Sequence, residues 1–187
     1  MSKAQTDNSF FADKVGLRLN VIPLRDISVL DGFAGCGSIW RMVRTRFPHE
    51  IRYVGLDKLP KSEEFIFLGD NTKTLADMDL DQFDVIDLDA YGVPFAQLEI
   101  IFDKGFKGIL FVTFIQSVMG KLPHNMLSAL GYSEDMVRKC PALFNRAGFE
   151  KFCNYLAFKG VNKITHRTKG RKSYIAFSMP PSLPDPS

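Results

Sequence analysis

Short apolar runs alternate with amphipathic segments along most of the chain, and this alternation predicts its secondary structure. Runs typical of buried strands occupy residues 27–32, 51–57, 64–70, 83–92 and 108–114. Helical patterns occupy residues 38–47, 94–105, 123–131 and 133–148. The last of these contains Pro141, which is expected to kink or break it. Two apolar segments near the C-terminus, 161–167 and 172–179, are joined by the turn sequence TKGR and predict an antiparallel hairpin.

Strands that alternate with helices favour a mostly parallel sheet with helices on both faces. We therefore predict a doubly wound α/β fold that ends in an antiparallel C-terminal hairpin, within one domain spanning residues 9–179. The polar residues 1–8 and the proline-rich residues 180–187 are expected to be flexible. Ligands of such folds bind at the carboxyl ends of the strands, so functional residues are expected there.

The composition is that of an ordinary soluble domain, with 45% hydrophobic and 24% charged residues. The net charge of +3 permits a polyanionic partner without requiring one. The three cysteines have no metal-binding spacing, which favours a reduced, cytoplasmic chain without a metal site. The N-terminus lacks the apolar core of a signal peptide, and no apolar run is long enough for a membrane span, so we expect no membrane association.

A glycine-rich turn follows the first strand, in the sequence VLDGFAGCGSIW of residues 29–40. Its candidate ligand-binding residues are Asp31, Gly32, Phe33, Ala34, Gly35 and Gly37. A dinucleotide-binding G-x-G-x-x-G motif would need a third glycine where Trp40 stands, which argues against a dinucleotide. A tight strand–helix turn without any ligand remains the alternative.

Polar side chains also end the second and third strands. Asp57 ends the second strand and is followed by Lys58, and Asp70 ends the third strand and is followed by Asn71. A lone loop carboxylate is usually just solvated, but acids at the ends of three successive strands after a glycine turn are hard to explain by solvation. The interval from Asp57 to Asp70 leaves room for only a loop or a single helical turn besides the third strand.

This arrangement resembles the first motifs of class I S-adenosylmethionine-dependent methyltransferases, which have a Rossmann-like fold. The resemblance implies that the glycine turn approaches the methionine and ribose parts of that cofactor and that Asp31 lies near its ammonium group. It further implies that Asp57, beside Lys58, binds the ribose hydroxyls and that Asp70 and Asn71 bind the adenine.

The fourth strand ends in the sequence FDVIDLDAYGVP, residues 83–94, which carries two acids at its end. Asp87 and Asp89 are two residues apart, so both side chains point to the same face of a strand. Buried carboxylates are costly unless they meet cations, amino groups or backbone donors. Capping of the following turn and helix is one explanation, and a functional role is the other.

The same segment resembles the (D/N/S)-P-P-(Y/F/W) motif of amino-methyltransferases and, more closely, the D-x-D-P-(F/Y)-G-x-P motif of tRNA (guanine-N2) dimethyltransferases. The positions that match the second motif are Asp87, Asp89, Tyr91, Gly92 and Pro94. The resemblance implies that Asp89 accepts a hydrogen bond from an exocyclic base amine, that Tyr91 stacks on the base, and that Asp87 serves both cofactor and catalysis. It leads us to expect N-methylation of a nucleic-acid base, with RNA slightly favoured over DNA.

Two residues depart from that motif. Ala90 replaces its proline, and Phe114 stands where that family tends to carry an acid. The large C-terminal domain of that family is also missing, so we expect a different substrate or help from another chain, either a partner subunit or a second copy. The alternatives are a methyltransferase of small molecules or proteins, and a cofactor-binding module without catalytic activity.

A basic segment, residues 159–172, contains lysines, arginines and one histidine but no acid. It would contact phosphates if it lay beside the site, and is otherwise a solvated hairpin. Arg41, Arg44 and Arg46 of the first predicted helix could extend this basic surface or simply solvate that helix.

Residues 114–133 are long for a strand–helix connection and could form a lid. Within this segment His124 is as readily a helix-start residue as a catalytic base. Phe33, Phe95 and Phe114 fall near strand ends, where they could face a planar base or belong to the core.

Overall fold

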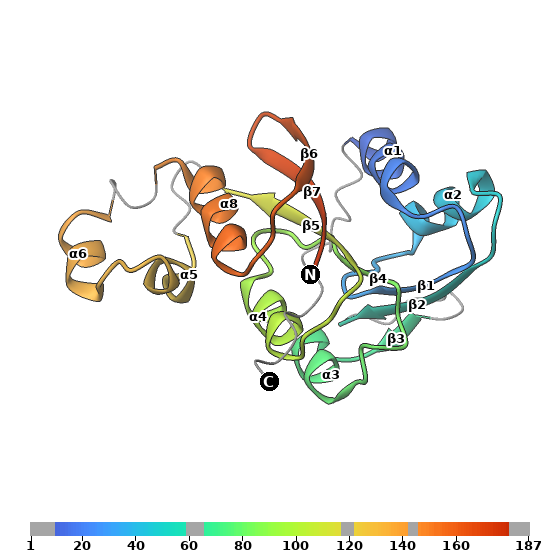
Figure 1. Ribbon diagram of the computed structural model, residues 1–187, viewed down its shortest axis with the longest axis horizontal. Helices are drawn as coiled ribbons and strands as arrows, with labels where there is room; N and C mark the ends of the chain where they lie inside the picture. The colour runs from blue at the N-terminus through green and yellow to red at the C-terminus, as the bar shows by residue number, and fades with distance from the viewer. Residues whose placement is uncertain (1–9, 59–65, 117–121, 142–145, 180–187) are drawn as a thin grey trace, which may run out of the picture.

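The computed structural model describes residues 10–58, 66–116, 122–141 and 146–179, and a seven-stranded sheet forms its centre (Figure 1). The strands are β1 (Ile27–Asp31), β2 (Ile51–Asp57), β3 (Ile66–Leu68), β4 (Val85–Leu88), β5 (Ile109–Ile115), β6 (Ile164–Lys169) and β7 (Lys172–Ser178). Their order is β3-β2-β1-β4-β5-β7-β6. β1 to β5 pair in parallel, and β7 pairs antiparallel with both β5 and β6. The order reverses between β1 and β4, which places the switch point of the sheet there.

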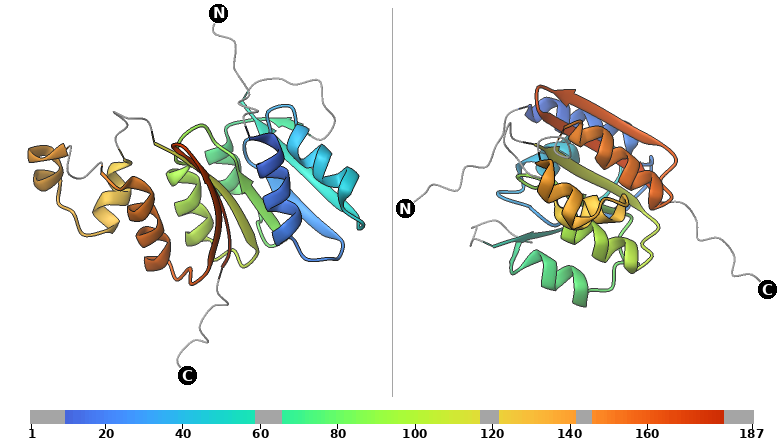
Figure 2. Two further views of the ribbon diagram at one scale, coloured as in Figure 1. Left: turned by 90° about the horizontal axis from the view of Figure 1, so that it is seen from above. Right: turned by 90° about the vertical axis from the view of Figure 1, so that its left-hand side faces the viewer.

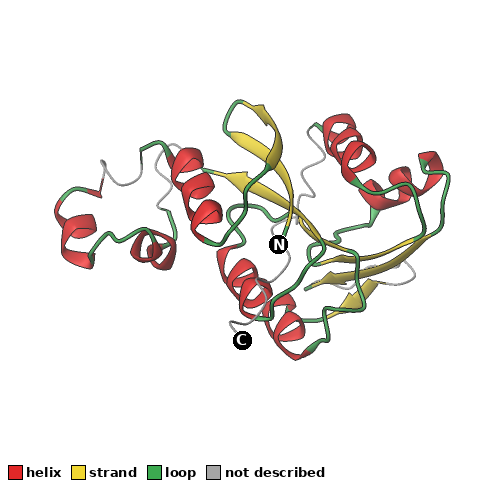
Figure 3. Ribbon diagram, in the orientation of Figure 1, coloured by secondary structure: helices red, strands yellow, loops and turns green. Residues whose placement is uncertain are grey.

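Helices cover both faces of the sheet (Figures 2 and 3). Along the chain they are α1 (Phe11–Val21), α2 (Ser38–Arg46), α3 (Asn71–Asp77), α4 (Phe95–Asp103), α5 (His124–Ala129), α6 (Glu134–Lys139) and α8 (Gly148–Phe158). α1 and α2 pack together on one face, and α3, α4 and α8 lie on the other. α5 and α6 extend from the α8 side, away from the sheet (Figure 1).

Alternate residues of the central strands contribute to two hydrophobic cores, one on each face. On the face of α1 and α2, Val85 and Phe111 belong to the same core as Trp40. On the other face, Leu88 belongs to the core beneath α4 and α8. Because successive strand residues point to opposite faces, Asp87 lies on the same face as Val85. This period of two determines that α1 and α2, rather than α4, can reach the acids of β4.

The predicted fold class is confirmed, because the sheet is doubly wound, mostly parallel and closed by an antiparallel hairpin at its edge. The helical segment predicted over residues 133–148 is interrupted where its break was expected, near Pro141. α6 ends at Lys139, and a separate helix begins at Gly148. Pro141 explains the end of α6, since the residue before a proline is disfavoured in the helical region. No pattern described above predicts α1, α3 or the body of α8.

Several predictions concern residues that the structure does not describe. The terminal segments expected to be flexible, 1–8 and 180–187, lie outside the described residues. So do residues 59–65, which make up most of the short connection expected between β2 and β3. β3 is shorter than the strand predicted over 64–70, because Asp70 is already the N-cap of α3.

Candidate functional site

The glycine-rich turn between β1 and α2 packs against the end of β2. Gly37 has a φ of 65° and is the N-cap of α2, a left-handed conformation that favours glycine. Gly55 of β2 has no room for a side chain, because a Cβ atom there would lie 2.8 Å from the Cβ of Ala34. The backbone N–H of Ala34 donates to the carbonyl of Leu56 at 3.0 Å. These contacts hold the turn at the carboxyl ends of β1 and β2.

Asp31 ends β1 in a buried position, with 5% exposure. Its Oδ1 accepts from the N–H of Phe33 at 3.1 Å, and its Oδ2 accepts from the hydroxyl of Tyr53 at 3.1 Å. Burial and the neighbouring Asp87 raise the pKa of Asp31 well above its ordinary value, although Arg18 acts in the opposite direction. Asp31 is thus a buried carboxyl group whose ionised form would gain from a further cation.

The acids predicted after β2 and β3 both accept hydrogen bonds from backbone N–H groups. Oδ2 of Asp57 accepts from the N–H of Gly35 at 2.8 Å, which ties the end of β2 to the glycine turn. Asp70 caps α3, and its Oδ1 accepts from two N–H groups of the first helical turn. The bond from the Lys73 backbone and the nearby Lys58, 3.5 Å away, lower the pKa of Asp70. Capping explains Asp70 whether or not it also contacts a ligand.

Asn71 and Gly32 connect the other strand ends. Asn71 is buried, and its Nδ2 donates to the carbonyl of Gly32 at 2.9 Å. The N–H of Gly32 donates in turn to the carbonyl of Asp87 at 2.8 Å. The structure therefore brings the predicted cofactor-binding residues together at the carboxyl edge of the sheet, and their binding role stays a prediction.

Asp87 is 1% exposed beneath this edge and receives three donors on one oxygen. Nε and Nη2 of Arg18 lie 2.7 Å and 2.6 Å from Oδ2, and Nε1 of Trp40 donates to the same atom at 2.7 Å. The guanidinium of Arg18 also lies 5.8 Å from the ring centre of Trp40 and 5.2 Å from that of Phe111. Burial raises the pKa of Asp87, although Arg18 lowers it. Within the described residues, Oδ1 of Asp87 is buried without a hydrogen-bond partner.

Asp89 follows β4 and is held by side chains from α1 and β5. Nζ of Lys14 lies 2.9 Å from Oδ1 and 2.7 Å from Oδ2, and the hydroxyl of Thr113 donates to Oδ1 at 2.6 Å. Nη2 of Arg18 lies 3.8 Å from Oδ2. The side chain of Asp89 is 11% exposed, against 1% for Asp87, so Asp89 is the acid of this strand that borders solvent.

The buried cluster combines three acids with two cations, namely Asp31, Asp87 and Asp89 with Lys14 and Arg18. With all three carboxyl groups ionised it would hold one negative charge in excess. An uncompensated buried charge is costly, so an additional ammonium group at this edge would stabilise the cluster. Burial first, and the negative charge of Asp87 second, raise the pKa of Asp31, and Oδ1 of Asp87 has no hydrogen-bond partner within the described residues.

Lys14 and Arg18 are site residues that the sequence analysis missed. They lie four residues apart on α1, so both side chains point to the same side of the helix, toward the sheet. Both are buried, together with Val15 and Leu17. The signal that could have found them is a pair of cations at helical spacing on an apolar face, in a chain whose fourth strand carries two acids to neutralise.

The aromatic candidates separate into surface and core. Tyr91 is 86% exposed in the turn after β4. Phe95 and Phe114 are buried beneath α8, where their rings contact Tyr155 and Phe152. The core alternative is therefore confirmed for these two residues. Phe33 is half-buried against the same core, and Tyr91 is the most exposed of the four candidates.

The segment considered as a lid is described only in part, because residues 117–121 lie outside the described residues. His124 begins α5, and its Nε2 lies 3.0 Å from a carboxylate oxygen of Glu134 in α6. That contact belongs to the projecting helices, so the structure does not bring His124 to the carboxylates of β1 and β4.

The basic hairpin lies beside the acids. Lys172, at the start of β7, pairs with Ile115, at the end of β5, so the turn between β6 and β7 projects from the carboxyl edge of the sheet. Asp13 of α1 neutralises part of its charge, with Lys169 at 2.7 Å and Arg167 at 3.5 Å. The hairpin therefore presents a basic surface at this edge, but one weaker than its sequence indicates.

The arginines of α2 do not all extend that surface. Arg44 and Arg46 belong to the last turn of α2, which runs away from the carboxyl edge where the helix begins. Arg41 lies closer, and its Nη2 donates to the carbonyl of Cys36 in the glycine turn at 3.1 Å.

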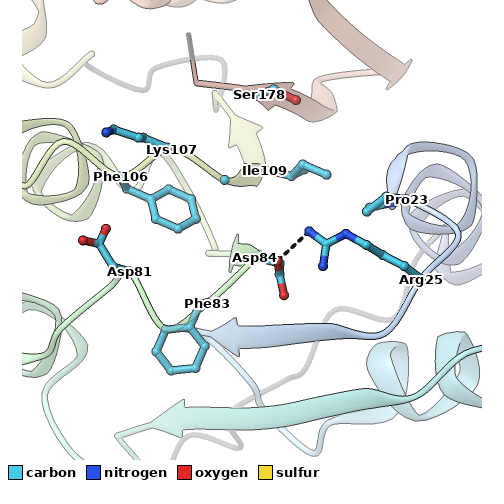
Figure 4. Close-up of a pocket in the computed structure, with 10 residues that line it drawn as sticks. Pro23, Arg25, Asp81, Phe83, Asp84, Phe106, Lys107, Ile109 and Ser178 are labelled. Carbon is cyan, nitrogen blue, oxygen red and sulfur yellow. Dashed lines mark hydrogen bonds and ion pairs between the residues drawn. The ribbon is translucent and has the colours of Figure 1, made fainter. Parts of the chain in front are cut away.

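A cavity of about 320 Å³ lies at the opposite edge of the sheet, at the amino ends of β4 and β5 (Figure 4). Its lining residues are Pro23, Arg25, Asp81, Phe83, Asp84, Phe106, Lys107, Gly108, Ile109 and Ser178. Arg25 forms an ion pair with Asp84 at 2.7 Å, and Asp84 also accepts bonds from the backbone and side chain of Ser28. These partners make Asp84 a structural acid, and the cavity contains none of the predicted site residues.

Within the described ranges, no group of three or more His, Cys, Asp or Glu side chains is arranged to hold a metal ion. In that same part of the chain, none of the helices combines the length and the apolar character needed to cross a membrane.

No protein-family model matches the sequence, and no curated protein matches it significantly. Solved structures nevertheless share its fold. A protein of Methanococcus maripaludis assigned as an S-adenosyl-L-methionine-dependent methyltransferase superposes with a TM-score of 0.54, over 98% of this chain and 99% of that one, at 15% identity. The S-adenosylhomocysteine-bound methyltransferase PaMTH1 of Podospora anserina gives 0.50 over 95% and 80% of the two chains, at 15% identity. A protein of Clostridium thermocellum assigned as an rRNA methylase gives 0.51 over 89% and 93%, at 10% identity. At these identities the likeness establishes the fold, which is that of class I methyltransferases.

Proposed function

We propose that this protein is an S-adenosylmethionine-dependent methyltransferase. The observation that carries the proposal is the cluster of buried carboxylates at the carboxyl edge, which lacks one positive charge and borders a glycine turn. The ammonium group of the cofactor's methionine part would supply that charge beside Asp31. The methyltransferase fold of the structural neighbours supports the same cofactor.

The same edge offers a partner for each part of the cofactor. The backbone of the turn at Gly35 and Gly37 can approach a ligand closely, because no side chain intervenes. Asp57 would accept from the ribose hydroxyls, and Asp70 with Asn71 would lie at the adenine. When bound, S-adenosylmethionine supplies a methyl group on a sulfonium, which becomes a neutral thioether as the acceptor nitrogen takes the methyl and gives up a proton to water.

The acceptor proposed here is an exocyclic amine of a nucleic-acid base. The lone pair of such a nitrogen is delocalised, so a hydrogen-bond acceptor on its N–H favours attack on the methyl group. Asp89 borders solvent and would act by positioning and by accepting this bond. Tyr91 is exposed two residues further on and would stack on the base. Asp87 is too deeply buried to reach an acceptor, so its proposed share is charge balance beneath the cofactor.

The position of the β6–β7 turn supports nucleic acid over a small molecule as the acceptor. This turn projects from the edge that carries Asp89, Arg171 lies in it, and Lys172 directly follows it as the first residue of β7. Lysine and arginine at such a place attract backbone phosphates. The Clostridium thermocellum neighbour adds an analogy at the level of the fold alone. RNA is the acceptor proposed first, and DNA second.

Transfer of labelled methyl groups tests the proposal. The protein is incubated with methyl-labelled S-adenosylmethionine and, in separate reactions, total RNA, total DNA and total protein. We expect label in nucleic acid, its loss in Asp89→Ala, and its retention in Asp81→Ala, an exposed acid at the opposite edge. Label in protein alone would refute the proposed acceptor.

A cofactor-binding module without activity is the second candidate, and one observation favours it. Lys14 contacts both carboxylate oxygens of Asp89, which reduces what that acid can offer to a substrate. Binding of S-adenosylhomocysteine by a protein that labels no RNA, DNA, protein or small-molecule fraction would support this candidate.

A further inference from the structure

Among the residues that the structure describes, the contacts of Asp89 leave it with one open acceptor position. A carboxylate has about four lone-pair positions, two on each oxygen. Lys14 takes one on each oxygen, at 2.9 Å and 2.7 Å, and Thr113 takes the second on Oδ1, at 2.6 Å. Nη2 of Arg18 lies 3.8 Å from Oδ2, beyond hydrogen-bonding distance. The open position is therefore the second one on Oδ2.

We propose that Lys14 and Thr113 are positioning residues for the methyl acceptor. They fix the Asp89 carboxylate so that its one open position, on Oδ2, receives the N–H of the acceptor amine. This inference rests on the methyl transfer proposed above and goes further, because it assigns roles to two residues outside the methyltransferase motifs. Under this proposal the Lys14–Asp89 ion pair, which was the observation in favour of a module without activity, belongs to the active arrangement.

Three elements hold this carboxylate, and that is why it has a single orientation. Asp89 directly follows β4, Thr113 lies in β5, and Lys14 lies in α1 with its side chain 8% exposed. α1 is itself tied to the sheet one turn further on, where Arg18 binds Asp87 and donates to the carbonyl of Lys14 at 2.9 Å. Rotation of the Asp89 carboxylate would break contacts with both Lys14 and Thr113.

Catalysis by positioning is sensitive to small displacements, and a shift of about 1 Å can cost on the order of 10²-fold in rate. The Lys14→Met variant keeps an unbranched side chain but loses the ammonium, so Asp89 loses its partner from α1. We expect kcat for methyl transfer to fall by about that factor. Binding of S-adenosylhomocysteine should not weaken, because loss of the Lys14 charge increases the negative excess that attracts the ammonium group of this ligand. Lys14→Arg, which keeps a cationic donor, should recover most of the activity.

Thr113 gives an independent test that does not alter a charge. Thr113→Val has nearly the same shape and lacks only the hydroxyl, so it should fold normally and lose about tenfold in kcat. Thr113→Ser keeps the hydroxyl and should stay close to wild type. Both variants should bind S-adenosylhomocysteine as the wild type does, because Thr113 contacts Asp89 and not the glycine turn.

The decisive experiment measures kcat, KM for the RNA acceptor and calorimetric Kd for S-adenosylhomocysteine in all four variants. A kcat loss confined to Lys14→Met and Thr113→Val, without weaker binding of S-adenosylhomocysteine in either, supports the inference. Wild-type kcat in both, or kcat and cofactor affinity lost together in all four variants, would overturn it. A wild-type protein that binds S-adenosylhomocysteine but transfers no methyl group would instead refute the proposed function, and this inference with it.

Discussion

Replacing Arg18 by methionine should expose the electrostatic cost on which the candidate site is built. Arg18 supplies two of the three donors to Oδ2 of Asp87, at 2.7 Å and 2.6 Å, and both residues are buried. Without Arg18, the one donor to the Asp87 carboxylate that remains among the described residues is the indole N–H of Trp40. Removing one partner of a buried ion pair costs about 3–5 kcal/mol, a large share of the roughly 5–15 kcal/mol that stabilises a domain.

The effect should depend on pH in a defined direction. Burial already raises the pKa of Asp87, and loss of the lowering effect of Arg18 raises it further. The comparison is between about pH 5.5 and about pH 7.5, and in the unfolded chain Asp87 is ionised at both. In the folded Arg18→Met variant, Asp87 takes up a proton more readily as the pH falls. The folded state is therefore favoured at the lower pH, and Arg18→Met should lose less stability there than at the higher pH.

Urea denaturation followed by fluorescence measures these free energies of unfolding. Trp40 is the single tryptophan of the chain and is bonded to Asp87, so its emission reports on this site directly. Arg25→Met is the matched control, because the Arg25–Asp84 pair is largely exposed and should contribute no more than about 1 kcal/mol. The double variant Arg18→Met/Asp87→Asn should be more stable than Arg18→Met alone, since no unpaired charge remains. A double variant less stable than Arg18→Met would refute the reasoning. So would a loss of free energy of unfolding in Arg18→Met no larger than that in Arg25→Met.

Three further outcomes are expected. The ammonium group of the cofactor favours the ionised form of Asp31, whose pKa is raised in the free protein, so the affinity for S-adenosylhomocysteine should fall as the pH falls below that pKa. Calorimetry over a pH series checks this, and an affinity that does not change with pH would contradict it. Asp70→Ala removes the cap of α3 and should lower the free energy of unfolding, measured by urea denaturation, by about 1 kcal/mol. Asp70→Asn should lower it little, and equal losses in the two variants would argue against the capping role. Tyr91→Ala should leave the melting temperature unchanged and raise KM for RNA by roughly 5- to 150-fold, which corresponds to about 1–3 kcal/mol of lost stacking, and an unchanged KM would remove Tyr91 from the site.

The central part of the fold could be predicted because its strands are short, apolar and followed by polar turn residues. The acids that end β1, β2 and β4 stood out for the same reason, and parallel strands bring their carboxyl ends to one edge. α1 was missed because its inward face mixes Val15 and Leu17 with Lys14 and Arg18, which blurs the apolar period. Which acid each cation neutralises depends on the packing of α1 across the sheet, and no local pattern contains that information.

The two departures from the fourth motif have explanations that only the structure supplies. The N–H of Ala90 donates to the carbonyl of Leu88 at 2.8 Å, a bond that proline could not make. Phe114 is buried, and its ring centre lies 5.2 Å from that of Phe152 in α8. An acid at this position would lie in the core, so the hydrophobic residue follows from how α8 covers the sheet.

Calorimetric titration with S-adenosylhomocysteine tests the central claim most directly, because it asks whether the charge deficit at the carboxyl edge is a cofactor site. The comparison is between the wild type and Asp31→Asn, which removes the charge and keeps one oxygen to accept from the Phe33 N–H. Its amide NH2 then faces the Tyr53 hydroxyl, which can turn to accept instead of donate. We expect the wild type to bind one molecule per chain and Asp31→Asn to bind at least about tenfold more weakly. No binding by the folded wild type, or equal affinity of the two proteins, would contradict the account.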